Sequence, residues 1–156
     1  STPATAALTQ AGIPFVVRAY EHDSQVTDFG AEAASALGVP AERVFKTLLA
    51  EVDGVLAVAI VPVSGKLDLK ALAAALGGKK AVMADPTLVE RKTGYVVGGI
   101  SPIGQRTRLR TVLDSTAVDF ETVLVSGGRR GFDVELAPAQ LAEVTAATVA
   151  AIGRAD

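Results

Sequence analysis

The sequence predicts an α/β (α+β) fold: one domain over residues 1–156, with a mixed β-sheet and surrounding helices. A length of 156 residues favours one domain that is large enough for a full core. Short runs rich in β-branched residues alternate with short helical patterns. Asp53-Gly54 between two such runs is the strongest hairpin signal in the chain. Strands mixed with peripheral helices, including one tight hairpin, indicate this class of fold.

In the first half of the chain, helices are predicted from capping residues and strands from β-branched and aromatic runs. The predicted helices are residues 4–11, capped by Thr2 with Pro3 at the first position and ended by Gly12, and residues 29–37, capped by Asp28 and ended by Gly38. The predicted strands are residues 14–20, 44–52 and 55–63.

The second half continues the same mixture of helices and strands. Its predicted helices are residues 69–76 after Asp68, residues 86–92 after Asp85, and a helix opened by Ala137-Pro138. Its predicted strands are residues 111–114, 122–125 and 131–136. Residues 94–104 hold four glycines and a proline, which indicates a shaped loop, and the tail from Ala146 is either helix or strand.

Composition excludes several classes of site. The chain has no Cys and one His, which removes disulfides, Cys-ligated zinc, a protein thiol nucleophile and a multi-histidine metal site. We therefore expect no metal and no cofactor. No signal-peptide pattern opens the chain and no apolar run could span a bilayer, so an intracellular, cytoplasmic protein without membrane contact is expected. No feature specifies an oligomeric state.

The net charge of −2 argues against a protein that binds nucleic acid through bulk charge. The distribution is uneven: residues 79–130 hold nine Lys/Arg and five Asp/Glu, which gives +4. These cations either form one phosphate-facing positive rim or belong to an ordinary solvated surface. They are Lys79, Lys80, Arg91, Lys92, Arg106, Arg108, Arg110, Arg129 and Arg130.

Lys46 interrupts an apolar stretch that runs from Val44 to Ala50 and suits a buried strand. Removing an ammonium group from water costs several kcal/mol unless something compensates it. The charge of Lys46 is therefore expected either in a cleft that receives an anion or a polarised oxygen, or at a strand end where it reaches water.

Two glycine-rich stretches are candidate walls of such a cleft. Gly98-Gly99 and Ser126-Gly127-Gly128 offer backbone N–H groups that no side chain covers, although most such stretches simply mark turns. Gly98-Gly99 belongs neither to a Walker loop nor to a full dinucleotide fingerprint. A nucleophilic role for Ser126 has no support, because His22 is the only imidazole and the flanking Gly-x-Ser-x-Gly pattern is absent.

Three further side chains have two readings each, and a fourth has one. Asp133 either binds a substrate amine or is a carboxylate on a strand face. Tyr20 and Phe29 are either core aromatics or part of a ligand pocket. His22, in a polar turn, is expected to be solvated.

Seven motifs occur along the chain in a fixed order. They are Tyr20-Glu21-His22-Asp23, Phe29-Gly30, Phe45-Lys46-Thr47-Leu48-Leu49, Leu67-Asp68-Leu69-Lys70, Met83-Ala84-Asp85-Pro86, Thr93-Gly94-Tyr95-Val96-Val97-Gly98-Gly99-Ile100-Ser101-Pro102 and Val125-Ser126-Gly127-Gly128. Together they closely resemble the YbaK/EbsC family of bacterial Cys-tRNA(Pro) deacylases, from about Thr2 to the C-terminus.

That resemblance implies the fold of the editing domain inserted in bacterial prolyl-tRNA synthetases. It implies hydrolysis of the ester that joins a mischarged amino acid to tRNA. Cys-tRNA(Pro) is the expected substrate, with Cys-tRNA(Cys) as a second candidate. The expected partners are the 3′ end of the aminoacyl-tRNA and prolyl-tRNA synthetase, beside which such an enzyme acts in trans.

The resemblance also implies a set of site residues. It places the catalytic groups at Lys46, Gly98 and Gly99. The implied substrate-binding residues are Tyr20, Phe29, Thr47, Ile100, Ser126, Gly127 and Asp133. Arg129-Arg130 stand where a Lys-Arg pair is expected, which keeps the charge, and Phe132 is bulkier than the expected aliphatic residue.

An aminoacyl ester is already activated, so such a site needs positioning and oxyanion stabilisation more than a strong base. The Gly98 and Gly99 N–H groups are expected to receive the oxyanion, and Lys46 to hold a terminal phosphate or ribose or to polarise the carbonyl. The resemblance suggests that the substrate's own thiol is the nucleophile. The alternatives are a deacylase for another small amino acid such as Ala, a non-catalytic module for tRNA 3′ ends or a synthetase, and a small-molecule phosphate hydrolase.

Overall fold

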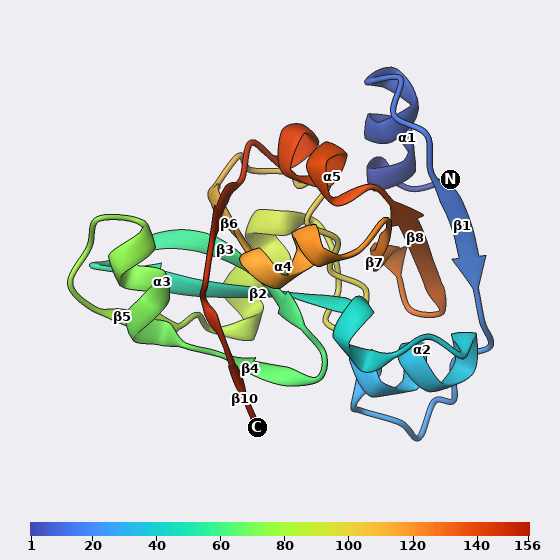
Figure 1. The fold of residues 1–156 in the computed structure, drawn as a ribbon, viewed down its shortest axis with the longest axis horizontal. Coiled ribbons are helices and arrows are strands. Elements are labelled where there is room, and N and C mark those ends of the chain that lie inside the picture. The colour runs from blue at the N-terminus through green and yellow to red at the C-terminus, as the bar shows by residue number, and fades with distance from the viewer.

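The computed structural model describes all 156 residues (Figure 1). In chain order its elements are α1 (Pro3–Gln10), β1 (Val16–Ala19), α2 (Phe29–Leu37), the 3₁₀ helix η1 (Ala41–Arg43), β2 (Phe45–Val52), β3 (Val55–Pro62), β4 (Gly65–Leu67), α3 (Leu69–Ala75), β5 (Ala81–Met83), α4 (Pro86–Thr93), β6 (Arg110–Asp114), the 3₁₀ helix η2 (Ser115–Asp119), β7 (Val123–Arg129), β8 (Phe132–Leu136), α5 (Pro138–Thr145), β9 (Thr148–Ala150) and β10 (Gly153–Ala155).

The largest sheet is five-stranded and mixed, in the order β5-β2-β3-β6-β9. Strand β2 is antiparallel to both β3 and β5, whereas β3 pairs with β6, and β6 with β9, in parallel. The β2–β3 hairpin turns at Asp53-Gly54 as predicted, and both residues have positive φ, at 49° and 82°. This backbone matches the twist of the two strands that it joins.

Two smaller sheets flank the large one. Strands β1, β8 and β7 form an antiparallel three-stranded sheet near α1 and α2, while β10 returns along β4 in a two-stranded one. Figure 1 shows the three-stranded sheet at the end of the molecule opposite α3 and β5. An isolated parallel bridge between Val44 and Leu124 joins β7 to the start of β2.

Successive side chains of the central strands point to opposite faces of the sheet, so the interior consists of two apolar clusters, one on each face. On β3, Val58 and Ile60 belong to the larger cluster, which packs below α1, α4 and α5. Their neighbours Ala59 and Val61 point the other way and pack with Leu72 of α3. Because both faces of the sheet are covered, these strands are almost continuously apolar rather than alternating.

The capping residues confirm most of the predicted helix boundaries. The side chains of Thr2, Asp28, Asp68 and Asp85 each accept a hydrogen bond from a backbone N–H in the first turn of their helix. The C-terminal tail forms the short strands β9 and β10, so the helical alternative is wrong. The three-residue strands β4 and β5 escaped prediction because so few residues show no periodicity.

No helix of the structure is both long and apolar enough to cross a membrane.

Candidate functional site

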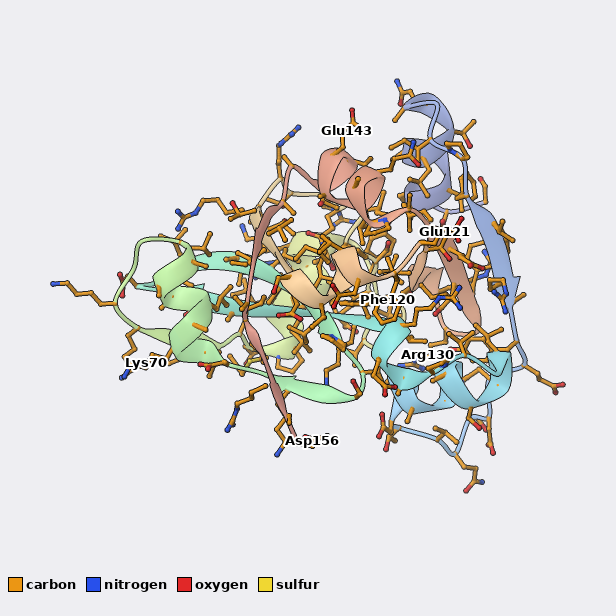
Figure 2. All side chains as sticks on the ribbon, viewed as in Figure 1. Lys70, Phe120, Glu121, Arg130, Glu143 and Asp156 are labelled. Atoms are coloured by element: carbon orange, nitrogen blue, oxygen red, sulfur yellow. The ribbon has the colours of Figure 1, made fainter.

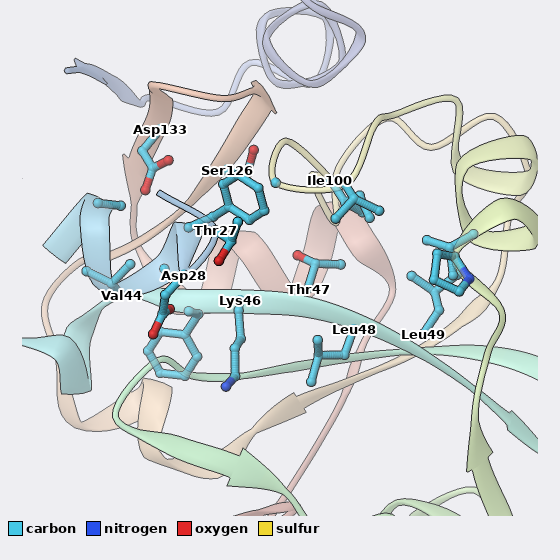
Figure 3. Close-up of a pocket in the computed structure, with 18 of the residues that line it drawn as sticks. Thr27, Asp28, Val44, Lys46, Thr47, Leu48, Leu49, Ile100, Ser126 and Asp133 are labelled. Carbon is cyan, nitrogen blue, oxygen red and sulfur yellow. The ribbon is translucent and has the colours of Figure 1, made fainter. Parts of the chain in front are cut away.

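One cavity of about 310 Å³ lies where β2, α2, the 94–104 loop and the β7–β8 hairpin meet (Figure 3). Its lining is mostly apolar, with a few polar groups. Eight of the ten predicted site residues line it: Tyr20, Phe29, Lys46, Thr47, Gly98, Ile100, Ser126 and Asp133. The other two, Gly99 and Gly127, are buried and do not line the cavity. A volume near the lower end of the usual ~300–1,000 Å³ range suits an aminoacyl group and part of a sugar.

The cavity lies along an unpaired edge of β2. The Val63 N–H donates to the Val44 carbonyl at 2.8 Å, and antiparallel alternation then turns the backbone of Thr47 and Leu49 away from β3. On that outer side, β5 pairs only with residues 50–52, and the Leu49 carbonyl accepts from Ala84. The backbone N–H and C=O of Thr47 therefore face the cavity without a strand partner.

The side chain of Thr47 reinforces this arrangement. Its Oγ1 is buried and has no hydrogen-bond partner. Figure 3 shows the side chain leaving β2 on the side of Ile100 and Ser126. Buried polar atoms without partners are rare in native proteins, because each one costs about 1–3 kcal/mol. The cavity is therefore suited to a ligand that carries a hydrogen-bonding group to Thr47.

Lys46 leaves β2 in the opposite direction (Figure 3). Its Nζ donates to the Gly65 carbonyl at 2.9 Å, and no carboxylate pairs with it. The side chain is half-buried and lines the cavity. Neither predicted alternative describes Lys46 fully, because the residue lines the cavity while its ammonium is anchored to a backbone carbonyl of β4.

The glycine loop forms a tight turn over the cavity. The Gly99 N–H donates to the Val96 carbonyl at 2.8 Å, so it is already bonded, whereas no backbone bond of the loop uses the N–H of Gly98 or Ile100. Of the two glycines, we therefore keep only Gly98 as a candidate oxyanion donor. Gly99 is needed for packing, since a Cβ there would lie 2.6 Å from the Cα of Arg129.

Arg130 fastens this loop to helix α2. Its Nε and Nη2 donate to the Val97 carbonyl at 2.9 and 2.7 Å, and its guanidinium lies 4.9 Å from the centre of the Phe29 ring. A Cβ on Gly98 would lie 2.7 Å from Phe29 and 2.8 Å from the Arg130 Nε. The sequence suggested either a phosphate-facing role or an ordinary solvated position for Arg130 and gave no sign of this structural role, which depends on tertiary contacts.

The β7–β8 hairpin supplies the opposite wall. Ser126 lies directly across from Asp133 in the register of the two strands, and its Oγ accepts from the Gly128 N–H at 3.2 Å. Gly127 lies behind this wall, where a Cβ would lie 2.6 Å from the Phe132 ring. The bulky Phe132 ring thus packs against Gly127 and not against the cavity. The Arg129 guanidinium lies over the Phe132 ring, 4.1 Å from its centre.

Asp133 is the one strongly perturbed carboxyl group of the cavity. It is only 5% exposed, no hydrogen bond or ion pair holds it, and burial raises its pKa from 3.8 to about 7. Burial, together with the charge of Asp133, raises the pKa of Tyr20 to about 12, so its hydroxyl stays a donor at neutral pH. A buried carboxyl group that titrates near neutrality could pair with a substrate ammonium.

His22 is not free in solvent, so that prediction is wrong. Its Nδ1 lies 2.6 Å from Glu32 Oε1, and the second oxygen of Glu32 accepts from the Asp23 N–H at 2.8 Å. The imidazole centre lies 5.7 Å from the Phe29 ring. The pair ties the 20–28 segment to α2 behind the cavity wall, through a partner ten residues away that no local pattern reveals.

The predicted positive rim is divided. Lys79 and Lys80 lie at the far end of the five-stranded sheet, where their backbone N–H groups donate to Asp53 at the hairpin. Arg129 and Arg130 lie beside the glycine loop instead. A single rim of all nine cations is therefore wrong, although a smaller basic group remains near the cavity.

Sequence reasoning did not assign several apolar residues to the wall of the cavity, some of which flank Lys46 and Thr47 along β2 and some of which belong to segments distant in sequence. They are Val44, Phe45, Leu48, Leu49, Met83, Ala84, Pro86, Val89 and Val97. Nowhere do three His, Cys, Asp or Glu side chains gather in a group that could hold a metal ion.

Comparison with known proteins identifies the family of this chain. Residues 23–144 match the family model described as an aminoacyl-tRNA editing domain. A protein of Enterococcus faecalis, provisionally described as a Cys-tRNA(Pro)/Cys-tRNA(Cys) deacylase, EbsC, is 40% identical over 113 residues, which cover 72% of this chain and 69% of that protein. The proline–tRNA ligase of Geobacter metallireducens is 33% identical over 99 residues, which cover 64% of this chain and 17% of the ligase.

A solved structure shares the fold over almost the whole length. It is a crystal structure provisionally described as a trans-editing enzyme for prolyl-tRNA synthetase, with a TM-score of 0.83 and 26% identity, covering 97% of this chain and 95% of that chain. The fold and these relatives define a small α+β enzyme domain of the aminoacyl-tRNA deacylase class. The chain belongs to the family of aminoacyl-tRNA editing domains, as the sequence resemblance implied.

Proposed function

We propose that this protein deacylates mischarged Cys-tRNA(Pro) in trans, with Cys-tRNA(Cys) as a second substrate. The observation that supports this most is the meeting of the Phe45-Lys46-Thr47 edge with the Gly98 loop in one cavity, in a chain of the aminoacyl-tRNA editing family. The E. faecalis relative described with both Cys-tRNA substrates adds support. Translation takes place in the cytoplasm, and we propose that the protein acts there.

The polar groups of the cavity divide the work of holding the ester. Asp133 pairs with the α-ammonium of the amino acid, since it is the only carboxyl group that the cavity buries. The Gly98 N–H receives the oxyanion that develops on the ester carbonyl, as a preformed donor should. Lys46 leaves the Gly65 carbonyl and binds the terminal ribose or phosphate. Phe29 and Tyr20 limit the space for the side chain.

The chemical step needs no nucleophile from the protein. The substrate's cysteinyl sulfur attacks its own ester carbonyl, so that a C–S bond forms and the C–O bond to the ribose breaks. The thiol proton passes to the ribose oxygen, and the products are tRNA and a cyclic thiolactone of cysteine. Thiols are the most nucleophilic side chains near neutral pH because a few per cent is already thiolate. This chain has no Cys of its own that could compete.

Discrimination by size alone would be weak in this cavity. A difference of one methylene is worth only ~1–3 kcal/mol, so Ser or Ala would enter a pocket that admits Cys. Reaction through the substrate thiol removes that difficulty, because Ser would bind but react slowly. We propose prolyl-tRNA synthetase as the partner that presents the mischarged tRNA, on the support of the related segment within proline–tRNA ligases.

The test is a deacylation assay with labelled Cys-tRNA(Pro), Ala-tRNA(Pro) and correctly charged Pro-tRNA(Pro), without and with added prolyl-tRNA synthetase. We expect rapid release of Cys and none of Pro. Faster release of Ala would assign the protein to another mischarged amino acid. Binding of tRNA without release of any amino acid would identify a non-catalytic module and overturn the proposal.

A further inference from the structure

A group of cations surrounds the loop that leads into the cavity. Residues 91–113 hold five Lys or Arg and no Asp or Glu. Arg91 and Lys92 form the basic last turn of α4, and Arg106 packs beside them. We call Arg91, Lys92 and Arg106, together with Arg129 and Arg130 on the other side of the loop, the basic loop surface. Arg110 does not belong to it, because its guanidinium donates to the Leu76 carbonyl at the end of α3.

Hydrogen bonds connect the two sides of the basic loop surface through the 94–98 loop. The Arg106 guanidinium donates to the Arg91 carbonyl at 3.4 Å, and the backbone N–H of Arg106 donates to the Thr93 carbonyl at 2.9 Å. At the other end of the loop, Arg130 donates twice to the Val97 carbonyl. Only Tyr95 and Val96 lie between Gly94 and Val97, so the Cα atoms of Gly94 and Val97 lie within about 11 Å of each other.

These cations have no carboxylate partners. The ion pairs of the protein involve Arg18, Arg43, His22 and Lys66, none of which belongs to the basic loop surface. The Glu90 carboxylate, next to Arg91 in the chain, accepts from the Val97 N–H at 2.7 Å and holds the loop. Clustered cations that remain unpaired beside a binding cavity raise the local concentration of a polyanion.

The ridge between the two cationic groups is apolar and open to solvent. Val96 is 53% exposed and Val97 is 37% exposed, and Val97 also lines the cavity. Figure 2 shows Arg130 beside α2. Cations along an apolar strip are the combination that single-stranded nucleic acids require, since the strip packs against sugars and bases while the cations meet phosphates.

We propose that the basic loop surface binds the phosphates of the single-stranded 3′ end of an RNA whose terminal ester occupies the cavity. This inference rests on the proposed function. A cavity of about 310 Å³ holds the aminoacyl group and part of the terminal nucleotide, so the preceding nucleotides leave across its rim. The 94–98 loop is the part of the rim that cations flank, and Gly98 lies at its end.

The test compares two substrates in charge-removing variants of the full chain. The double variant Arg91→Gln/Arg106→Gln removes two cations that lie outside the cavity. We expect KM for Cys-tRNA(Pro) to rise about five- to tenfold, with kcat unchanged. The logarithm of the association constant decreases linearly with the logarithm of the salt concentration, by about 0.7 for each phosphate contact to a single strand. In the double variant, the magnitude of this slope should therefore be smaller by about 1.4. Hydrolysis of cysteine esterified to a plain nucleoside should not change.

The matched control is Lys79→Gln/Lys80→Gln, which removes two exposed lysines at the far end of the sheet and should change neither substrate. An equal loss with both substrates, or an equal effect of the control, would overturn the proposal, as would an unchanged KM and salt slope. Binding of a short single-stranded RNA that ends in CCA provides a second measurement. If that RNA binds through Arg91 and Arg106 while no ester is cleaved, the surface stands and the proposed function fails.

Discussion

The Lys46 ammonium group is held 2.9 Å from the carbonyl oxygen of Gly65, on a short strand that the C-terminal strand fixes in place. A Cβ at Gly65 would lie 2.5 Å from the Arg154 carbonyl, so β4 and β10 approach too closely there for any side chain. Asp114 anchors β10 by accepting the N–H groups of Ile152 and Gly153 at 2.9 and 2.8 Å. The position of Lys46 thus depends on contacts with residues a hundred positions away.

The first prediction concerns Lys46. Lys46→Ala should lower kcat for Cys-tRNA(Pro) by about 10²–10³, the usual loss when one electrostatic contact at a reacting centre is removed. The fold should survive, because the side chain is only half-buried and makes one neutral hydrogen bond, worth about 1 kcal/mol. Single-turnover deacylation and thermal unfolding together measure both effects.

Lys66→Ala is the matched control for this prediction. Lys66 lies on β4 next to Gly65, its side chain is 63% exposed, and its only partner is Asp156 at 3.8 Å. An exposed pair of this kind contributes little to stability. We expect normal turnover from Lys66→Ala. Near-normal turnover from a folded Lys46→Ala protein would remove Lys46 from the mechanism.

The second prediction concerns the pH dependence of stability. Burial holds the pKa of Asp133 at about 7 in the folded protein, against 3.8 in the unfolded chain. Below about pH 4 both states are protonated, and there is no penalty. As pH rises from about 4 to about 7, the unfolded chain releases this proton and the folded protein keeps it, so the free energy of unfolding falls. The full loss above pH 7 is on the order of 4 kcal/mol.

Asp133→Asn removes the ionisation and keeps the shape of the side chain. The variant should therefore be more stable than the parent, by an amount that grows from pH 4 to pH 7 and is constant above. Chemical denaturation of both proteins across this range gives the difference directly, and other titrating groups cancel in it. A difference that does not change with pH would show that Asp133 is already ionised in the folded state.

The local part of this fold was readable from the sequence. The caps Asp28 and Gly38 give the bounds of α2, and Asp53-Gly54 gives the β2–β3 hairpin, because each depends on residues that are neighbours in the chain. The two short strands β9 and β10 carry no such local signal. They form because β6 and β4 offer open edges to pair with.

The site was predictable as a set of residues but not as a geometry. The motifs brought Lys46, Thr47 and Gly98 to attention, and all three line the cavity. That Lys46 and Thr47 leave β2 in opposite directions follows from strand periodicity, whereas the anchor of Lys46 on Gly65 does not. The bond from the Gly99 N–H to Val96 likewise depends on how the loop closes.

The third prediction concerns Gly98. Its φ is +91°, and a Cβ would press on Phe29 and on Arg130. Gly98→Ala should lower kcat at least tenfold, because either Phe29 or the loop must move and the Gly98 N–H then leaves its place. The stability loss should be about 1–3 kcal/mol, as for a strained backbone position.

Gly77→Ala separates backbone strain from the clash. Gly77 follows α3 and has a φ of +72°, and no atom lies within 4 Å of the position that an added Cβ would occupy. This control should lose similar stability and keep full activity. Equal turnover by Gly98→Ala and Gly77→Ala would show that the geometry at Gly98 does not matter for the reaction.

The last prediction concerns the nucleophile. If the substrate thiol attacks the ester, Cys-tRNA(Pro) should be cleaved at least 10²-fold faster than Ser-tRNA(Pro), because a hydroxyl is far less nucleophilic than a thiol near neutral pH. An S-methylated cysteinyl ester should also resist, although the cavity of about 310 Å³ has room for one more methyl group. The first product from Cys-tRNA(Pro), trapped within one turnover, should be the cyclic thiolactone. Comparable rates for all three esters, with free amino acid as the first product, would identify water as the nucleophile. Asp133 would then be the candidate base, since it is the buried carboxyl group of the cavity and burial holds its pKa at about 7.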